Sequence, residues 1–184
     1  MTEEERRGLR AHPSRETDDA DAAAVDNVSF AVRNSLAAAR RGGWSAVGAV
    51  THVALGAIRG ALEIGSDLTQ AGKGIIVGVL HGSGERGEGA LDTISQAART
   101  VLHHTAAMGS DVTSVTTGIV KGAIQKALDF GVDVTRAASA AAQGALEGAK
   151  DVSFAAAQQV RGALAGHFDG VRIMLLPPYQ QQER

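Results

Sequence analysis

The sequence contains no cysteine, only three prolines and few aromatic side chains (3%). The missing cysteines exclude disulfides, thiolate metal sites and cysteine nucleophiles, and they are typical of a cytoplasmic protein. The shortage of aromatic residues implies a core of small side chains, each of which buries little area. We therefore expect a protein that is less stable or more elongated than most domains of 184 residues.

Long hydrophobic runs and a strong net charge are also missing. The longest uncharged span, 42–58, contains His52 and several glycines, so a membrane-spanning helix there is not favoured. The charged start lacks the apolar segment of a secretory signal. A net charge of −2 gives no indication of a nucleic-acid partner.

Alanine and glycine are abundant instead, with 34 and 23 residues, and similar segments recur along the chain. ALEIGSDLTQA (61–71), TAAMGSDVTSV (105–115) and ALDFGVDVTRA (127–137) begin 44 and 22 residues apart. Glycine recurs at 43, 65, 87, 109 and 131, and a second series contains Gly56, Gly78, Gly122, Gly144 and Gly166. Two glycine series with one period indicate an internal repeat.

The period of 22 residues has a helical meaning, because it is two units of 11 residues and each unit makes close to three helical turns. Apolar residues within a unit are three and four apart, as in Ile75, Ile76, Val79 and Leu80. The sequence therefore predicts an all-α fold without a sheet, built from Ala/Gly-rich amphipathic helices as an elongated or open helical-hairpin bundle.

The repeated pattern Gly-x-Asp-[Leu/Val]-Thr predicts turns between helices. Its glycines suit the position after a helix, and its aspartates suit the N-cap of the next helix. The predicted turn and cap residues are Gly65, Asp67, Gly109, Asp111, Gly131 and Asp133. Because the apolar pattern continues through these sites, helical hairpins and near-continuous long helices both remain open.

The ends of the chain differ from its middle. We expect residues 1–17 to be a disordered charged arm, 18–176 to be a single helical repeat region with a break near 81–88, and 177–184 to be a polar tail. A first helix is expected from about Asp18 to Arg41. The apolar piece VRIMLL (171–176) could be a short strand or a docking element.

The stretch HGSGERGEG (81–89) matches the dinucleotide-binding pattern G-x-G-x-x-G at Gly82, Gly84 and Gly87. The preceding GIIVGVL aligns with helical repeat segments, and no second strand follows at the required distance. The acidic Glu85 and Glu88 would repel a pyrophosphate. We therefore interpret the stretch as a hinge formed by Gly82, Gly84, Gly87 and Gly89, with no cofactor.

Catalytic and metal-binding patterns are not apparent. His103 and His104 are adjacent, so on a helix they point about 100° apart and do not chelate as a pair. No G-x-S-x-G nucleophile motif occurs. The sequence therefore predicts no metal, no catalytic residue and no enzyme activity, although an active site without a recognisable motif stays open as a third hypothesis.

Glycines spaced one helical turn apart let helix backbones approach closely, in membranes or in packed bundles. We accordingly predict close helix packing at Gly56, Gly78, Gly122, Gly144 and Gly166. The stretch GAIQKALDFGVDVTRAASAAAQGALEGAKDV (122–152) resembles the late-embryogenesis-abundant-like and phasin-like helical proteins in composition and period. That resemblance implies a protein that coats hydrophobic or membrane surfaces, or folds on contact with them.

Two functions follow as hypotheses. The first is a non-enzymatic structural protein whose amphipathic helices adsorb to a lipid, granule or partner-helix surface, with a cytoplasmic, peripheral-membrane or granule location. The alternative is a self-assembling helical scaffold in which glycine faces pack between copies as a homo-oligomer. The number of helices and the presence of turns at Gly65, Gly109 and Gly131 bear most directly on the choice.

Overall fold

The computed structural model describes residues 13–42, 46–63, 67–165, 168 and 170–175. Over these residues the chain forms seven α-helices and one 3-10 helix. The elements are α2 (Pro13–Arg41), α3 (Ala46–Glu63), α4 (Leu68–Ser83), α5 (Glu88–Ala107), α6 (Val112–Lys126), η1 (Leu128–Phe130), α7 (Val134–Lys150) and α8 (Phe154–Leu164). Within this part of the chain, Phe168 and Val171 form an isolated β-bridge and no sheet is present. The predicted all-α class without a sheet is confirmed there.

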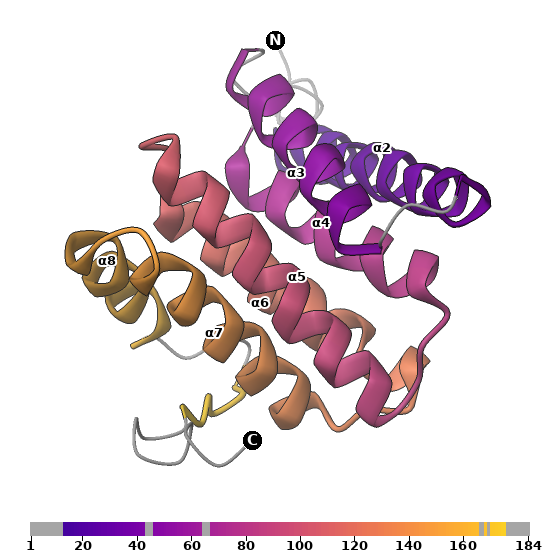
Figure 1. Cartoon of the computed structure of the whole chain (residues 1–184). Coiled ribbons are helices and arrows are strands. Elements are labelled where there is room, and N and C mark those ends of the chain that lie inside the picture. The colour runs from indigo at the N-terminus through magenta and orange to yellow at the C-terminus, as the bar shows by residue number, and fades with distance from the viewer. Residues whose placement is uncertain (1–12, 43–45, 64–66, 166–167, 169, 176–184) are drawn as a thin grey trace, which may run out of the picture.

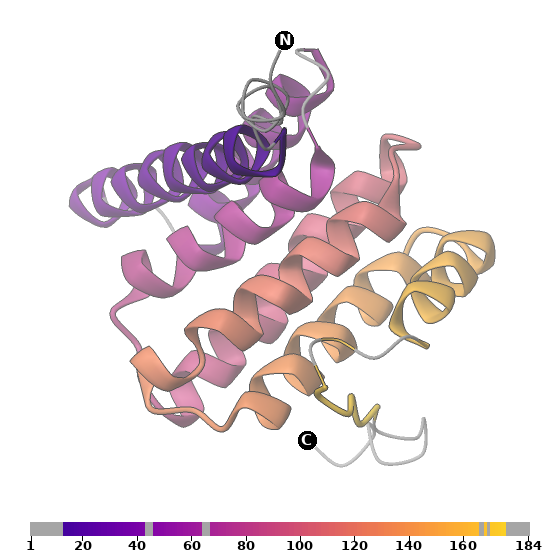
Figure 2. The ribbon, with the colours of Figure 1, turned by 180° about the vertical axis from the view of Figure 1, so that it is seen from behind.

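The helices are arranged in two layers that pack face to face (Figure 1; Figure 2). α3, α5 and α7 form one layer, α2, α4 and α6 form the other, and α8 packs against α6 and α7. Neighbours within a layer are two helices apart in the chain. Each turn therefore returns the chain to the other layer, and the result is a compact bundle, not an elongated array of continuous helices.

Glycines set the short distance between helices of one layer. A Cβ added at Gly74 or Gly78 of α4 would lie 2.9 or 2.6 Å from the carbonyl oxygen of Val25 or Ser29 in α2. A Cβ added at a glycine of α6 or α7 would likewise lie against the backbone of a neighbouring helix. The pairs are Gly118 with Thr69, Gly122 with Lys73, Gly144 with Ser95 and Gly148 with Arg99. In every pair the facing residue lies 49 positions earlier in the chain, so these helices run parallel in one register.

The core between the layers consists of small and branched aliphatic side chains. The largest completely buried ones include Ile58, Ile75, Ile94, Leu102 and Ile119. The side of α7 that faces the core is almost entirely alanine and glycine. Because an alanine buries little area, the dispersion contacts of this core depend on close approach of the backbones.

Aspartate side chains begin three of the helices. Asp67 accepts a hydrogen bond from the backbone N–H of Thr69 at 2.7 Å, and Asp133 accepts one from the N–H of Arg136 at 3.0 Å. Asp111 is the N-cap of α6. These bonds satisfy backbone donors that a helix start leaves without partners.

Replacing the Asp111 cap is expected to weaken the fold. Its carboxylate accepts the backbone N–H groups of Thr113 (2.9 Å) and Ser114 (3.2 Å) and the Ser114 hydroxyl (2.6 Å). Asp111→Ala removes all three bonds, so we expect the free energy of unfolding at neutral pH to fall by about 1 kcal/mol in urea denaturation.

The same cap is expected to make stability depend on pH. The hydroxyl and N–H groups of Ser114 hold the pKa of Asp111 below its ordinary value of 3.8. A depressed pKa in the folded state gives stability that is complete above the ordinary pKa and is lost as pH falls through the lower, folded value. Asp111→Asn keeps a capping oxygen without this titration, so it should lose less stability than the parent chain between neutral pH and about pH 3. Equal losses would contradict the assignment.

One predicted boundary is wrong. α2 begins at Pro13, not near Asp18, because proline is tolerated in the first helical turn, where no N–H partner is needed. The last described helix, α8, ends at Leu164. Residues 170–175, which contain most of the segment VRIMLL, are not helical, and the Met174 N–H donates to the Ser139 hydroxyl at 3.0 Å, so this segment contacts α7. Residues 1–12 and the predicted tail 177–184 lie outside the described residues.

Candidate functional site

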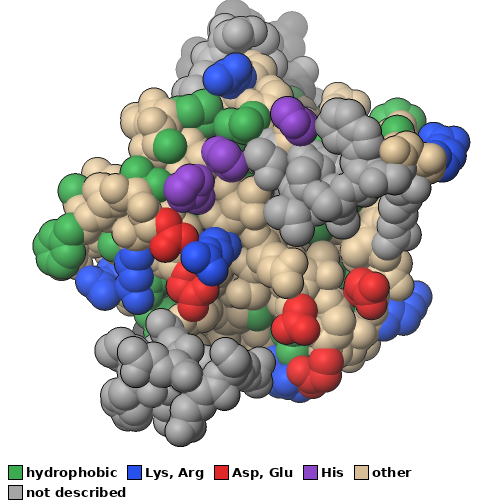
Figure 3. Space-filling view, viewed as in Figure 1, with side chains coloured by type: hydrophobic (Ala, Val, Ile, Leu, Met, Phe, Trp, Pro, Cys, Tyr) green, Lys and Arg blue, Asp and Glu red, His purple; other side chains and the backbone are tan. Residues whose placement is uncertain are grey.

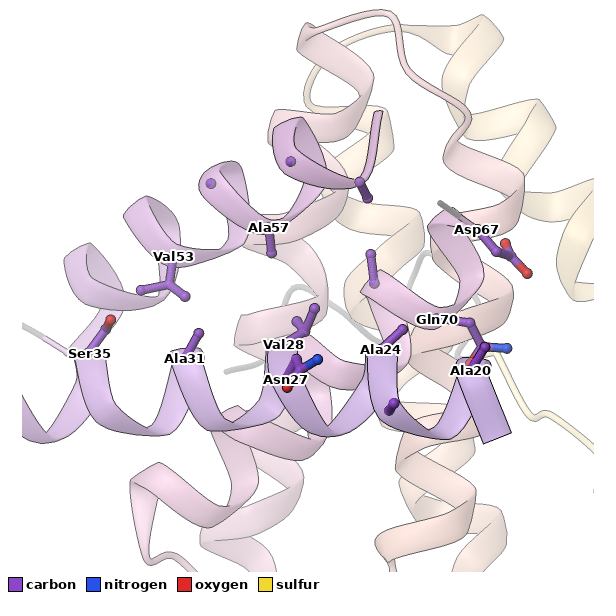
Figure 4. Close-up of a pocket in the computed structure, with 15 residues that line it drawn as sticks. Ala20, Ala24, Asn27, Val28, Ala31, Ser35, Val53, Ala57, Asp67 and Gln70 are labelled. Atoms are coloured by element: carbon purple, nitrogen blue, oxygen red, sulfur yellow. The ribbon is translucent and has the colours of Figure 1, made fainter. Parts of the chain in front are cut away.

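A groove of about 780 Å³ lies between α2 and α3, and the start of α4 contributes one end of it (Figure 4). Its walls are made of small side chains, among them Ala24 and Ala31 of α2 and Gly56, Ala57 and Gly60 of α3. The volume falls within the range of about 300–1,000 Å³ that is typical of ligand sites. The groove is the candidate functional site.

The groove exists because α2 and α3 each carry two small-residue or apolar faces. On α2, Val25, Val32 and Leu36 are buried against the bundle. Ala24 and Ala31, spaced seven residues apart, lie on another side of the same helix and face the groove. The groove-facing side chains are too small to fill the space between the two helices.

The structure contradicts the predicted close packing of Gly56. A Cβ added there would meet nothing within 4 Å among the described residues, and the same is true of Gly60. In contrast, a Cβ at Gly78, Gly122 or Gly144, which share its place in the 22-residue series, would overlap a neighbouring helix. The reason is that α3 is the first described helix of its layer, so Gly56 faces the groove.

Other predicted glycine positions fall at the turns. Gly109 follows α5 and Gly131 follows η1, both with positive φ, at 68° and 70°. Gly65 and Gly166 lie outside the described residues.

The predicted hinge is shorter than the sequence indicated. Gly84 and Gly87 lie in the loop between α4 and α5 with φ of 70° and 56°, a region that favours glycine because it lacks a Cβ. Gly82 belongs to the last turn of α4, where a Cβ would lie 2.7 Å from the Leu36 side chain. Gly89 belongs to the first turn of α5. Gly82 and Gly89 are therefore helical residues and not part of the hinge.

The loop that matches the phosphate-binding pattern is fastened to the chain itself. The Gly87 N–H donates to the carbonyl of Phe130 at 3.0 Å, and the Arg86 guanidinium donates to the carbonyl of Asp129 at 3.1 Å. The His81 ring packs edge-on against the Phe130 ring, with centroids 5.2 Å apart. Helices lie on both sides of the loop, so its surroundings are those of a turn between packed helices.

The polar groups of the groove do not form a catalytic arrangement. Asn27, Ser35, Asp67 and Gln70 are the polar side chains among the described residues that line it. Asp67 is used as a helix cap through the N–H of Thr69. No histidine, lysine or arginine stands in this described lining to act as a base or to stabilise developing negative charge.

The histidines lie elsewhere. His103 and His104 are on α5, and their ring centroids are 5.2 Å apart. Burial of its ring lowers the pKa of His104, and the nearby charge of His103 lowers it further. Figure 3 shows histidines on the face formed by α3, α5 and α7, together with interspersed charges of both signs. Over the described residues, no group of three or more potential ligands could hold a metal ion. Arg99 of α5 bonds to Asp151 after α7 at 2.8 Å, which joins these elements.

None of the helices in the described residues is both long and apolar enough to cross a bilayer, including α3, which contains most of span 42–58.

Comparisons with protein-family models, curated proteins and solved structures find no match. The likeness to late-embryogenesis-abundant-like and phasin-like proteins therefore rests on composition and period alone.

Sequence reasoning missed the groove, although part of its signal was present. Ala20, Ala24, Asn27 and Ala31 recur at helical spacing in a segment that was expected to be helical from Asp18. The glycine period is the same at every copy of the repeat, so it carries no information about which helix lies at the end of a layer. The helix order is needed to show that one side of α3 is not covered by another described helix.

Proposed function

We propose that this chain is a non-enzymatic binding protein whose α2–α3 groove receives an apolar helix. The observation that carries the proposal is the pair Gly56 and Gly60, one turn apart on α3 and free of neighbours within 4 Å in the described structure. The corresponding glycines of α4, α6 and α7 each hold the backbone of another helix. Within this protein, pairs of glycines one turn apart already serve as packing surfaces for helices. A helix is therefore the ligand that best fits the same surface on α3.

The chemistry of the groove supports the same ligand. Its walls are mainly alanine, glycine and valine, with a few uncharged polar groups, and Asp67 is the acidic member. Small residues spaced one turn apart allow two helix backbones to approach closely, so that many weak contacts add together. A helix that presents alanine, glycine or serine toward α3 fits this surface best.

Adsorption of the repeated helices to lipid or granule surfaces is less well supported. The apolar faces of α4 to α7 are buried against each other in the bundle, for example through Ile76, Ile94 and Ile119. Those faces would be available to a lipid surface only after the bundle opened. We therefore narrow the proposed partner surface to a helix.

The proposal is tested by titrating a labelled alanine- and leucine-rich peptide of about 20 residues, long enough to form a helix, into the protein. We expect a rise in fluorescence anisotropy with the parent chain and no saturable rise with Gly56→Gln, whose side chain occupies the groove. Gly56 is exposed on a helix, so glutamine should stabilise the fold by about 0.5 kcal/mol.

Gly162→Gln is the matched control, because Gly162 is an exposed glycine of α8 with nothing within 4 Å in the described structure. It should bind the peptide as the parent chain does. Peptide binding that is equal in all three proteins would contradict a groove site. Absence of peptide binding, together with co-sedimentation with phosphatidylcholine liposomes, would favour lipid adsorption instead.

A further inference from the structure

We infer that the helix received by the groove is α2 of a second copy of this chain, in a two-fold dimer in which Phe30 of each copy enters the groove of the other. This inference rests on the proposed function and names the partner for that site. Its starting point is that the groove and an exposed apolar helix face lie side by side on the same surface.

Phe30 is the large apolar side chain of that surface. It is 58% exposed, and it follows Ala23 and Asn27 at helical spacing, so it lies at the rim of the groove-facing stripe of α2. The Arg33 guanidinium lies 5.5 Å from the centre of its ring. An exposed phenylalanine beside a groove lined by small residues supplies both the protruding and the hollow element of an interface.

The exposed face of α2 has the composition that α3 requires. Ala20, Ala23 and Ala31 are exposed where α2 forms one wall of the groove, and Ala37 and Ala38 are exposed further along the same helix. An alanine-rich face allows a helix backbone to come close to Gly56 and Gly60. A two-fold axis repeats this contact, because α2 of the first copy packs on α3 of the second and α2 of the second copy packs on α3 of the first.

The dimensions allow a dimer interface of nearly standard size. α2 and α3, with 29 and 18 residues, are about 43 and 27 Å long, and a helix is about 10 Å wide. Their outer faces therefore offer at most about 700 Å² per copy, compared with roughly 800 Å² per partner in standard specific interfaces.

The flanking charges are compatible with this pairing. α2 exposes Asp19 and Asp26 together with Arg33, and α3 exposes Arg59. The aspartates of one copy can lie beside Arg59 of the other at the rim, where charges influence orientation and association rate more than affinity.

The chain's own N-terminal segment is the competing occupant. Each packed glycine of the bundle faces a residue 49 positions earlier in the chain, and the same spacing would place residues 7 and 11 opposite Gly56 and Gly60. Residues 1–12, however, contain six charged side chains: Glu3, Glu4, Glu5, Arg6, Arg7 and Arg10. Among the described lining residues Asp67 is the one charged side chain, so burying such a segment in the groove would cost desolvation energy that a single carboxylate cannot offset.

Sedimentation equilibrium of the full-length chain from about 1 µM to about 1 mM tests the inference, because this range spans moderate and weak association. We expect a monomer–dimer equilibrium that Phe30→Ala weakens about tenfold or more, as truncation of a central aromatic does. Gly56→Gln should weaken it comparably.

The controls are Phe154→Ala, at a phenylalanine that is 74% exposed on α8, and Gly162→Gln, and both should leave the dissociation constant unchanged. A monomer at every concentration, or a dimer indifferent to Phe30→Ala and Gly56→Gln, would overturn the inference. Association that appears only when residues 1–12 are deleted would assign the groove to that segment and also overturn it. Peptide binding by a chain that stays monomeric would leave the proposed function standing and remove only the second copy as partner.

Discussion

The double variant Gly144→Ala/Gly148→Ala is expected to lower the midpoint of thermal unfolding by about 10 °C. A Cβ at either position would overlap a backbone carbonyl of α5, that of Ser95 or that of Arg99, and a backbone carbonyl cannot move away as a side chain can. α7 must therefore shift away from α5 along its alanine-rich face. Overpacking costs about 1–3 kcal/mol per site, and here we expect about 4 kcal/mol in total.

This result would run against helix propensity, which makes the test informative. Alanine is a better helix former than glycine by about 1 kcal/mol, so an isolated helix would gain stability from both changes. Gly56→Ala/Gly60→Ala is the matched control, with the same spacing on α3 and open space at both positions in the described structure. We expect circular dichroism melts to show the control pair at or above the parent midpoint. A similar decrease for both pairs would contradict the role of close backbone approach.

The second large effect is expected at the contact between α4 and α6. Ile76 is completely buried, and Ile76→Ala should lower the free energy of unfolding by about 2–5 kcal/mol through lost contacts and a cavity. Gly122→Ala should also destabilise, by about 1–3 kcal/mol, since its Cβ would overlap the Ile76 side chain and lie 3.0 Å from the Lys73 carbonyl.

The double variant should be more stable than the sum of the two losses predicts, by about 1 kcal/mol. The reason is that the new methyl group at position 122 occupies part of the space that the isoleucine leaves. Urea denaturation of the four proteins gives this coupling energy directly. Additive losses would show that the Gly122 contact with Ile76 does not determine the spacing of these helices.

How far the sequence predicts this structure depends on the kind of signal. Helix starts were readable because a capping aspartate acts within three residues of itself, as Asp111 does with Ser114. The helical class was readable from apolar spacing. Both signals are local, so the arrangement of the rest of the chain does not alter them.

The layer order was not readable, because it depends on contacts between residues 49 positions apart. Gly56 and Gly78 look alike in sequence, yet Gly78 contacts α2 and Gly56 has no neighbour within 4 Å among the residues that the structure describes. The groove follows from this difference. A repeat predicts the same environment at each copy, and the end of a layer is the place where that prediction must fail.

A helix that fills the groove between α2 and α3 would cover the side of α3 that no other described helix covers, and a single introduced thiol tests this most directly. The chain has no cysteine, so Ala31→Cys, at an exposed residue that lines the groove, and Gly162→Cys on α8 each provide one unique site for alkylation and leave Gly56 and Gly60 unchanged. We predict that the thiol at position 31 reacts more slowly as protein concentration rises, while the thiol at position 162 reacts at a constant rate. Reaction at position 31 that is slowed neither by rising concentration nor by the alanine- and leucine-rich peptide would contradict a helix in the groove.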